Sequence, residues 1–234
     1  MVRRAQGGDR RLAGEVRLTS TDSLGFAFLM PAFHGLHERH PDIRVVLQPS
    51  TQVHNLSKRE ADIAICTVKP DNPDLLARRI ASWPIGLFAS PDYLRLRGEP
   101  APGSAFAGHD LVVYQPYLES RRKVTLAGEF TAGRVVAGMN SSLMVRSAIK
   151  FGLGLGKDAT PLAEGDGLVR VWPDRTSVNP FDIWLVTHQY LRHTARIQAT
   201  INEILSGEPS PCSASRDGVP PRAPAVPFAS FRLQ

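Results

Sequence analysis

The sequence has few cysteines and no long apolar run. Its 234 residues include only two cysteines, Cys66 in an apolar strand pattern and Cys212 in a Pro-rich tail, which excludes a small disulfide-stapled fold and suits a reducing compartment. No uninterrupted apolar segment approaches the ~20 residues that a membrane-spanning helix needs. The arginines near the amino terminus are not followed by the apolar segment of a secretory signal. We therefore expect a cytoplasmic protein with no membrane partner.

The positive charge is not concentrated on one segment of the body. The net charge is +6, of which residues 1–13 contribute +3 and residues 207–234 contribute +1, so the body carries only +2. A dedicated nucleic-acid surface gathers Lys and Arg on one folded face. The short cluster Arg121, Arg122 and Lys123 is more typical of a solvated loop than of such a surface. The charge pattern thus gives no support for nucleic-acid binding by the body of the chain.

Motifs for catalysis and metal binding are also missing. The run Gly152–Lys157 looks like a phosphate-binding loop, but it follows a helix and continues with Asp158 instead of Ser or Thr. His34, His37 and His40 recur at every third position, but no third ligand is apparent on the same helix face, so a solvated polar face is the better interpretation. No nucleophile elbow and no Ser/His/Asp arrangement is present. We expect neither an enzyme nor a cofactor or metal.

Hydrophobic patterning predicts strands and helices that alternate along the chain, which is typical of α/β architecture with parallel strands. A helix over 22–39 should be kinked by Pro31, and Ser90 followed by Pro91 predicts a capped helix start. The segment after residue 206 is rich in Pro, Ser and Ala and is expected to be disordered. The expected strands are 16–20, 43–47, 61–67, 76–81, 85–89, 110–114, 134–137, 168–171 and 181–187, and the expected helices are 22–39, 53–59, one that starts at 91, 141–151 and 190–205.

Several stretches together resemble the effector-binding domain of LysR-type transcriptional regulators. The first are GEVRLTSTDSLGFAFLMPAF, HERHPDIRVVLQPS and the run from Glu60 to Ile65. The match continues in the same order with ARRIASWPIGLFASPDYL, AGHDLVVY, the helix that leads into Gly152-Leu153-Gly154, and Leu168 to Val171. The resemblance covers roughly residues 10–206, and the order of the stretches is more specific than any one of them.

The resemblance implies an α/β fold of two Rossmann-like subdomains, of periplasmic-binding-protein type II architecture, with a ligand cleft between them. Residues 1–13 would be the remnant of a linker helix, subdomain I would be 14–90 and 177–206, subdomain II would be 91–176, and 207–234 would be the disordered tail. The family's winged helix-turn-helix is not found in this sequence. The segment Gly154–Ala159 departs from the family pattern and predicts a shortened strand at the floor of subdomain II.

Small polar side chains follow three of the expected strands, at the edge where open α/β sheets bind ligands. Helix N-termini at these positions present unpaired N–H groups that bind anions. The same residue types also cap helices, so from the residues alone capping and ligand binding both remain open. The resemblance favours ligand binding. It also makes Thr67 a candidate ligand-binding residue; because Thr67 follows a buried strand, its alternative role is only to end that strand. The candidate ligand-binding residues are Thr19, Ser20, Thr21, Ser23, Ser50, Thr51, Thr67, Asn140 and Ser141.

The function that the resemblance implies is the sensing of a small, anionic metabolite in order to control transcription. Promoter DNA would be a partner only through the helix-turn-helix that this sequence lacks. A homodimer is implied, formed by the apolar helix from Phe26 to Leu36 against the second subdomain of the partner. The alternatives are a solute-binding protein of the same fold that works with a transporter, an enzyme of that fold, and a truncated remnant of a regulator.

Overall fold

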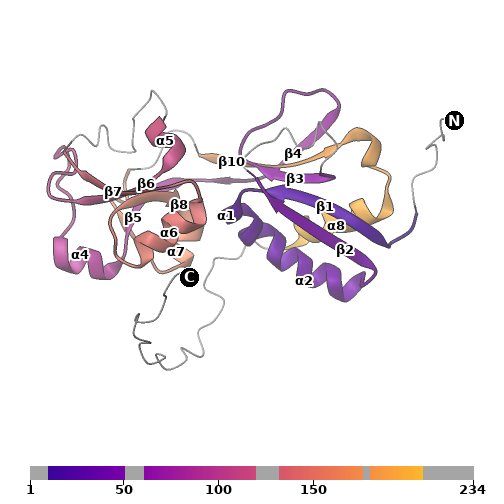
Figure 1. Ribbon diagram of the computed structural model, residues 1–234, viewed down its shortest axis with the longest axis horizontal. Helices are drawn as coiled ribbons and strands as arrows, with labels where there is room; N and C mark the ends of the chain where they lie inside the picture. The colour runs from indigo at the N-terminus through magenta and orange to yellow at the C-terminus, as the bar shows by residue number, and fades with distance from the viewer. Residues whose placement is uncertain (1–9, 51–60, 120–131, 176–179, 208–234) are drawn as a thin grey trace, which may run out of the picture.

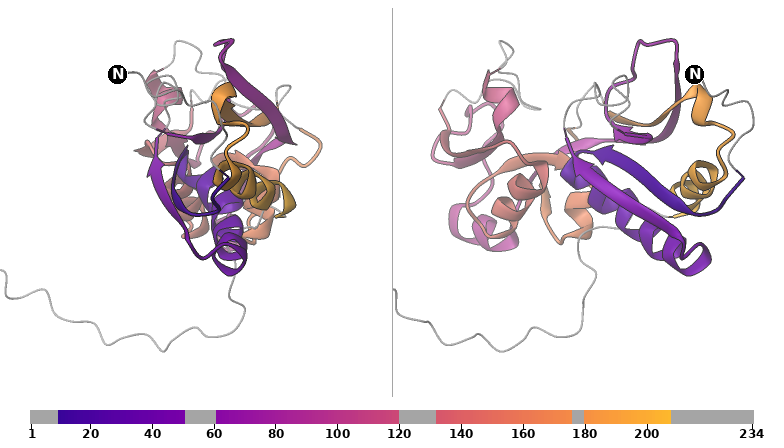
Figure 2. Two further views of the ribbon diagram at one scale, coloured as in Figure 1. Left: turned by 90° about the vertical axis from the view of Figure 1, so that its right-hand side faces the viewer. Right: turned by 45° about the vertical axis from the view of Figure 1, so that its right-hand side comes forward.

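The computed structural model describes residues 10–50, 61–119, 132–175 and 180–207. These residues form two α/β lobes that lie side by side, as Figure 1 and the right-hand view of Figure 2 both show. The expected two-lobed α/β fold is therefore confirmed. The expected helix over 53–59, the candidate residue Thr51, the basic cluster 121–123 and the expected disordered tail lie outside the described residues.

Lobe I is built on a five-stranded sheet in the order β2-β1-β3-β10-β4. β1 pairs in parallel with β2 and with β3, as the alternation of strands and helices predicts, whereas β10 runs antiparallel to both of its neighbours. Its elements are β1 (Gly14–Ser20), α1 (Asp22–Leu24), η1 (Gly25–Leu29), α2 (Met30–Arg39), β2 (Ile43–Pro49), β3 (Ile63–Cys66), β4 (Leu75–Trp83), β10 (Phe181–His188), η2 (Gln189–Leu191) and α8 (Ala195–Ser206).

The helix expected over 22–39 is continuous but changes its winding before the proline. Within η1 the backbone N–H of Met30 donates to the carbonyl of Gly25, five residues back, so this turn is wider than an α-helical turn. Pro31 then stands in the first turn of α2. Since proline has no N–H to donate, the chain accommodates it with a wide turn on its amino-terminal side instead of a break.

Lobe II contains a three-stranded sheet in the order β8-β5-β9 and a parallel pair, β6 with β7. The two parts are joined by backbone hydrogen bonds from Val112 N to Leu155 O (2.8 Å) and from Leu155 N to Asp110 O (2.9 Å). Its elements are β5 (Ile85–Ala89), α4 (Pro91–Arg97), β6 (Asp110–Tyr114), α5 (Gln115–Glu119), β7 (Arg134–Met139), α6 (Ser142–Lys150), β8 (Gly156–Ala159), α7 (Thr160–Gly165) and β9 (Val169–Val171).

One sequence-based expectation needs correction in lobe II. The strand β5 pairs with β8 and β9, so the chain leaves the sheet of lobe I at Pro84 and not at residue 90. Because Pro84 has no N–H, it ends the ladder of β4 and lets the next strand join another sheet. The Gly154–Ala159 segment, where a shortened strand was expected, contains a strand of four residues. Its last four residues form β8, which pairs antiparallel with β5.

Candidate functional site

A cavity of about 850 Å³, its open mouth included, lies between the two lobes. Its walls come from the end of β1 and the start of α1, from the crossing strands, and from β6, α5, α6 and β8 of lobe II. Apolar and aromatic side chains predominate, with hydroxyl groups and two charged groups among them. The polar and aromatic lining residues of this cleft cavity are Thr21, Ser23, Thr67, Trp83, Tyr114, Tyr117, Ser142, Lys157, Asp158 and Phe181.

The two charged residues of the cleft cavity are neighbours on β8. Burial lowers the pKa of the Lys157 ammonium, whose Nζ lies 5.4 Å from the centroid of the Tyr117 ring. Burial raises the pKa of Asp158 to about 6, although the Arg146 guanidinium lies 3.3 Å away and opposes this shift. The cavity therefore places a cation and a titratable acid in surroundings that disfavour both charges.

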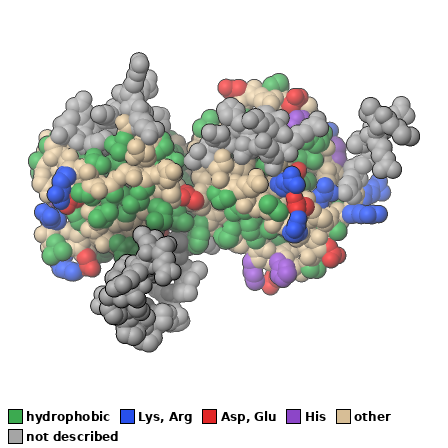
Figure 3. All heavy atoms as spheres, viewed as in Figure 1, with side chains coloured by type: hydrophobic (Ala, Val, Ile, Leu, Met, Phe, Trp, Pro, Cys, Tyr) green, Lys and Arg blue, Asp and Glu red, His purple; other side chains and the backbone are tan. Residues whose placement is uncertain are grey.

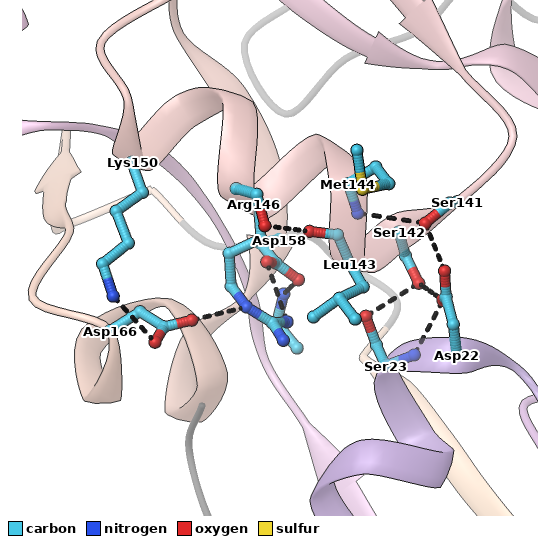
Figure 4. Close-up of polar contacts among 12 residues, drawn as sticks. Asp22, Ser23, Ser141, Ser142, Leu143, Met144, Arg146, Lys150, Asp158 and Asp166 are labelled. Atoms are coloured by element: carbon cyan, nitrogen blue, oxygen red, sulfur yellow. Dashed lines mark hydrogen bonds and ion pairs between the residues drawn. The ribbon is translucent and has the colours of Figure 1, made fainter. Parts of the chain in front are cut away.

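A buried ionic network supports this wall of the cavity. Arg146, on α6, is 1% exposed and lies between two carboxylates, with Asp166 at 2.8 Å and Asp158 at 3.3 Å (Figure 4). Lys150, one turn further along α6, lies 3.4 Å from Asp166. These contacts fix α6 within lobe II, so the start of this helix has a defined place at the cleft.

The start of α6 meets lobe I through Asp22 (Figure 4). The Ser142 hydroxyl donates to the Asp22 carboxylate over 2.8 Å, and the Ser141 hydroxyl donates to its other oxygen. The backbone N–H of Ser23 adds a bond of 2.7 Å, and that of Leu143 adds another. Burial alone would raise the pKa of Asp22, but these four hydrogen bonds together hold it below its usual value.

A second hollow of about 780 Å³ is lined by Asp22. Thr21 and Tyr114 line both this hollow and the cleft cavity, so the two spaces adjoin. Ser50, after β2, and Asn140, before α6, face the second hollow and not the cleft cavity. The loops after β1, after β2 and before α6 thus all reach the cleft region. Some of their polar residues line the cleft cavity and others line the second hollow.

The candidate residues differ in their placement. Thr21, Ser23 and Thr67 line the cleft cavity, whereas Ser50 and Asn140 line the second hollow. Three others are engaged or enclosed: in lobe I the Thr19 hydroxyl donates to the carbonyl of Gln48 (3.0 Å) and Ser20 is buried with no partner for its Oγ among the described residues, and in lobe II Ser141 contacts Asp22.

Helix capping accounts for one of these side chains directly. The Ser141 Oγ accepts a hydrogen bond from Met144 N (3.0 Å) and so caps α6 while its own proton goes to Asp22. Thr21 stands at the capping position of α1, but its side chain makes no capping bond there. Ser23 lies inside α1 with its Oγ 2.9 Å from that of Ser142. Capping is therefore a sufficient role for Ser141 and not for Thr21 or Ser23.

Sequence reasoning missed the charged residues of the site. Asp22 was treated only as the first residue of a helix, and Lys157 and Asp158 only as the end of a Gly-rich run. The aromatic pair Tyr114 and Tyr117, whose ring centroids are 5.7 Å apart, also went unrecognised. An acid inside a run of hydroxyl residues, TSTDS, was the one available signal for Asp22.

The described ranges offer neither a metal site nor a membrane-spanning helix. Within them, no cluster of three or more His, Cys, Asp or Glu side chains could hold a metal ion. None of the helices in those ranges combines the length and the apolar character needed to cross a membrane.

Comparison with known proteins identifies relatives among transcriptional regulators. An HTH-type transcriptional regulator CrgA from Neisseria meningitidis serogroup C is 33% identical over 96 residues, which are 41% of this chain and 32% of that protein. An HTH-type transcriptional regulator from Xanthomonas campestris is 31% identical over 99 residues, 42% of this chain and 28% of that protein. The matched segments thus span about a third or less of these relatives, which are regulators and not enzymes.

Solved structures agree with the two-lobed fold. The CrgA regulatory domain from Neisseria meningitidis has a TM-score of 0.71 at 23% identity, covering 82% of this chain and 98% of that one. Full-length AphB from Vibrio cholerae, described as a member of the LTTR family, has a TM-score of 0.69 at 25% identity, covering 86% and 71%. Residues 9–208 match the family described as the LysR substrate binding domain. The chain therefore belongs to the LysR substrate-binding family, and it is the effector-binding domain of a LysR-type regulator.

Proposed function

We propose that the cleft cavity binds a small anionic metabolite with a flat apolar body. The observation that carries this proposal is the position of Lys157, a partly buried cation beside the Tyr117 ring, in a cavity that Tyr114 and Trp83 also line. Withdrawal from water disfavours the ammonium, and an anion placed beside it offsets that cost. The aromatic walls supply apolar area for the rest of the ligand.

The ligand would act by contacting both lobes at once. Thr21, Ser23 and Thr67 approach the cleft cavity from lobe I, and Ser142 and Lys157 approach it from lobe II. A ligand that touches both sides favours the lobe arrangement in which both sets of contacts are made, and it shifts the population by its differential affinity for that arrangement. In a whole regulator, this shift would control transcription through a DNA-binding module.

The test of this proposal is a screen of small carboxylates by thermal shift, followed by calorimetry on variants. A hydrogen bond to a charged ligand group contributes about 1.5–3 kcal/mol, so Lys157→Met should weaken binding about tenfold to a hundredfold. Lys150→Met, at the far end of α6, is the matched control and should leave the dissociation constant unchanged. Equal affinity in both variants would overturn the assignment of Lys157.

The hydroxyl residues of the site allow a second comparison with the same ligand. Ser23→Ala should reduce affinity because Ser23 lines the cleft cavity, whereas Asn140→Ala should change it little because Asn140 lines the second hollow. Loss of affinity in Asn140→Ala alone would place the ligand in the second hollow. Lowered melting temperatures with unchanged affinity in both variants would leave the two residues with structural roles only.

Dimerisation and DNA binding complete the proposal. Phe26, Met30 and Phe33 form a stripe along η1 and α2, with Met30 41% exposed, and this stripe is proposed to meet the second lobe of a partner copy. Light scattering that gives a monomer at tens of micromolar would contradict it. On the face in Figure 3, Lys and Arg side chains lie in separate small groups, at the left end and at several places on the right-hand lobe, and not in one continuous patch. We accordingly expect no preference for one promoter over random duplex in a mobility-shift titration.

A further inference from the structure

The carboxylate of Asp22 lies at the start of a helix that belongs to the other lobe. Asp22 opens α1 in lobe I, whereas α6 begins in lobe II. Ser141 and Ser142, 119 and 120 positions away in the sequence, both donate their hydroxyl protons to this carboxylate, and Leu143 adds its backbone N–H (Figure 4). Three of the donors to one lobe I carboxylate therefore come from lobe II.

These donors are the ones that an external carboxylate would use. The first N–H groups of an α-helix have no partner within the helix, and the helix dipole favours negative charge beside them. Ser141 and Ser142 add two hydroxyl groups at the same place. In this structure the chain itself supplies the anion, and the hydrogen-bonding capacity at the start of α6 is engaged by Asp22.

The lobes also meet through apolar side chains that line the cleft cavity. Ala159 and Leu162, at the start of α7, pack into the main hydrophobic cluster of lobe I, which includes Leu24 and Trp83. This contact does not depend on charge. The Asp22 contact can therefore open while the lobes remain joined through these apolar side chains.

The helix that receives Asp22 is firmly held within its own lobe. Arg146 is buried and pairs with Asp158 and Asp166, and Ile149 is fully buried in a lobe II cluster. A movement of Asp22 away from α6 is thus a movement of lobe I relative to lobe II, and not a local shift of one helix end.

We infer that Asp22 is a latch between the lobes and an internal competitor for carboxylate ligands at the start of α6. In the ligand-free protein it holds the lobes together at the start of α6. A ligand whose carboxylate reaches Ser141, Ser142 and Leu143 binds there by displacing Asp22, and the displacement frees lobe I to move. The latch stands on the contacts described above, and only the identity of the displacing ligand rests on the proposed function.

Acetate tests the competitor role without knowledge of the natural ligand. Sodium acetate is titrated against sodium chloride at constant ionic strength while the melting temperature is measured, for the unaltered chain, Asp22→Ala and the control Asp42→Ala, which removes an exposed acid from the turn before β2. In Asp22→Ala the donors are vacant, so acetate should raise the melting temperature saturably and bind at least about tenfold more tightly than to the other two proteins. Equal responses in all three would overturn the inference.

Asp22→Asn keeps a neutral hydrogen-bond acceptor at this position. It provides a second test in case Asp22→Ala does not fold. It should retain the fold, loosen the latch and still exclude acetate. Spin labels at Glu38→Cys in lobe I and Leu96→Cys in lobe II, in a Cys212→Ser background, report the distance between the lobes. The distribution should broaden in Asp22→Asn relative to the unaltered chain, and an identical distribution would refute the latch. A failed ligand screen would affect the proposed function and leave both results intact.

Discussion

Lobe I and lobe II are stabilised by different interactions. The interior of lobe I holds a large apolar cluster that includes Leu18, Phe28 and Ile183 and extends from the sheet to α2 and α8, and a smaller one that includes Ala64 and Val186. Lobe II has two smaller apolar clusters, and between its helices α6 and α7 it buries the charged residue Arg146 with two carboxylates. Lobe II thus places polar and charged groups next to the cleft at the expense of apolar burial.

The helices of the two lobes begin in correspondingly different ways. In lobe II, Ser90 caps α4 and Ser141 caps α6 through their side chains. In lobe I, no side-chain capping bond forms at the starts of α1, α2 or α8. Burial of apolar faces stabilises the lobe I helices without caps, while two of the lobe II helices depend on specific polar contacts.

Among the substitutions that test this difference between the lobes, removal of Arg146 should lower stability the most. Arg146→Ala leaves the buried Asp158 without its cation and Asp166 with only Lys150, and loss of one partner of a buried ion pair typically costs about 3–5 kcal/mol of unfolding free energy. The control is Arg95→Ala, which removes the exposed pair with Asp92 and should cost no more than about 1 kcal/mol. Chemical denaturation measures both. Similar losses in the two variants would mean that the buried network contributes no more than a surface pair.

Elements of both lobes could be predicted from the sequence where their signals are local. The strand 16–20 was expected from alternation, and the start of α4 from Ser90 followed by Pro91, whose cap the structure confirms with a 3.1 Å bond to Tyr93 N. The boundary at Pro84 could not be predicted in this way, because both flanking segments are plain strands. Only the pairing partners decide which sheet each strand joins.

The candidate site was predictable in its location but not in its chemistry. The loops after β1 and β2 and the loop before α6 do reach the cleft region, since the topology places strand ends and helix starts there. The role of Asp22, by contrast, depends on a contact with residues about 120 positions away, and no local pattern encodes it. The same holds for Lys157, which lines the cleft cavity together with lobe I residues such as Thr67 and Trp83.

The two carboxylates at the cleft should respond to pH in opposite directions. The pKa of Asp158 is raised to about 6, so its contribution to stability is full below about pH 4 and is lost as pH rises to about 6, by at most about 3 kcal/mol. The pKa of Asp22 is lowered, so its contribution is present above about pH 4 and is lost as pH falls below that value.

Replacing Asp158 or Asp22 by the neutral Asn separates the pH response of that residue from the responses of all other acids. Between pH 4 and pH 7, Asp158→Asn should gain stability relative to the unaltered chain, whereas Asp22→Asn should lose it. Unfolding free energies at several pH values, expressed as differences from the unaltered chain, measure both trends. Parallel curves for the two variants would contradict the opposite pKa shifts.

The smallest effect expected concerns the helix caps that distinguish the lobes. Ser90 is buried and its Oγ accepts the Tyr93 N–H, so Ser90→Ala leaves this N–H without a partner at a cost of about 1 kcal/mol. Thr194 stands at the same position of α8 in lobe I but makes no capping bond, so Thr194→Val, which keeps the shape and removes only the hydroxyl, should change stability by less than about 0.5 kcal/mol. Thermal and chemical denaturation of both variants give the comparison. A larger loss for Thr194→Val than for Ser90→Ala would show that the helices of lobe I also depend on polar contacts at their starts, and the distinction between the two lobes would then rest on the buried charges alone.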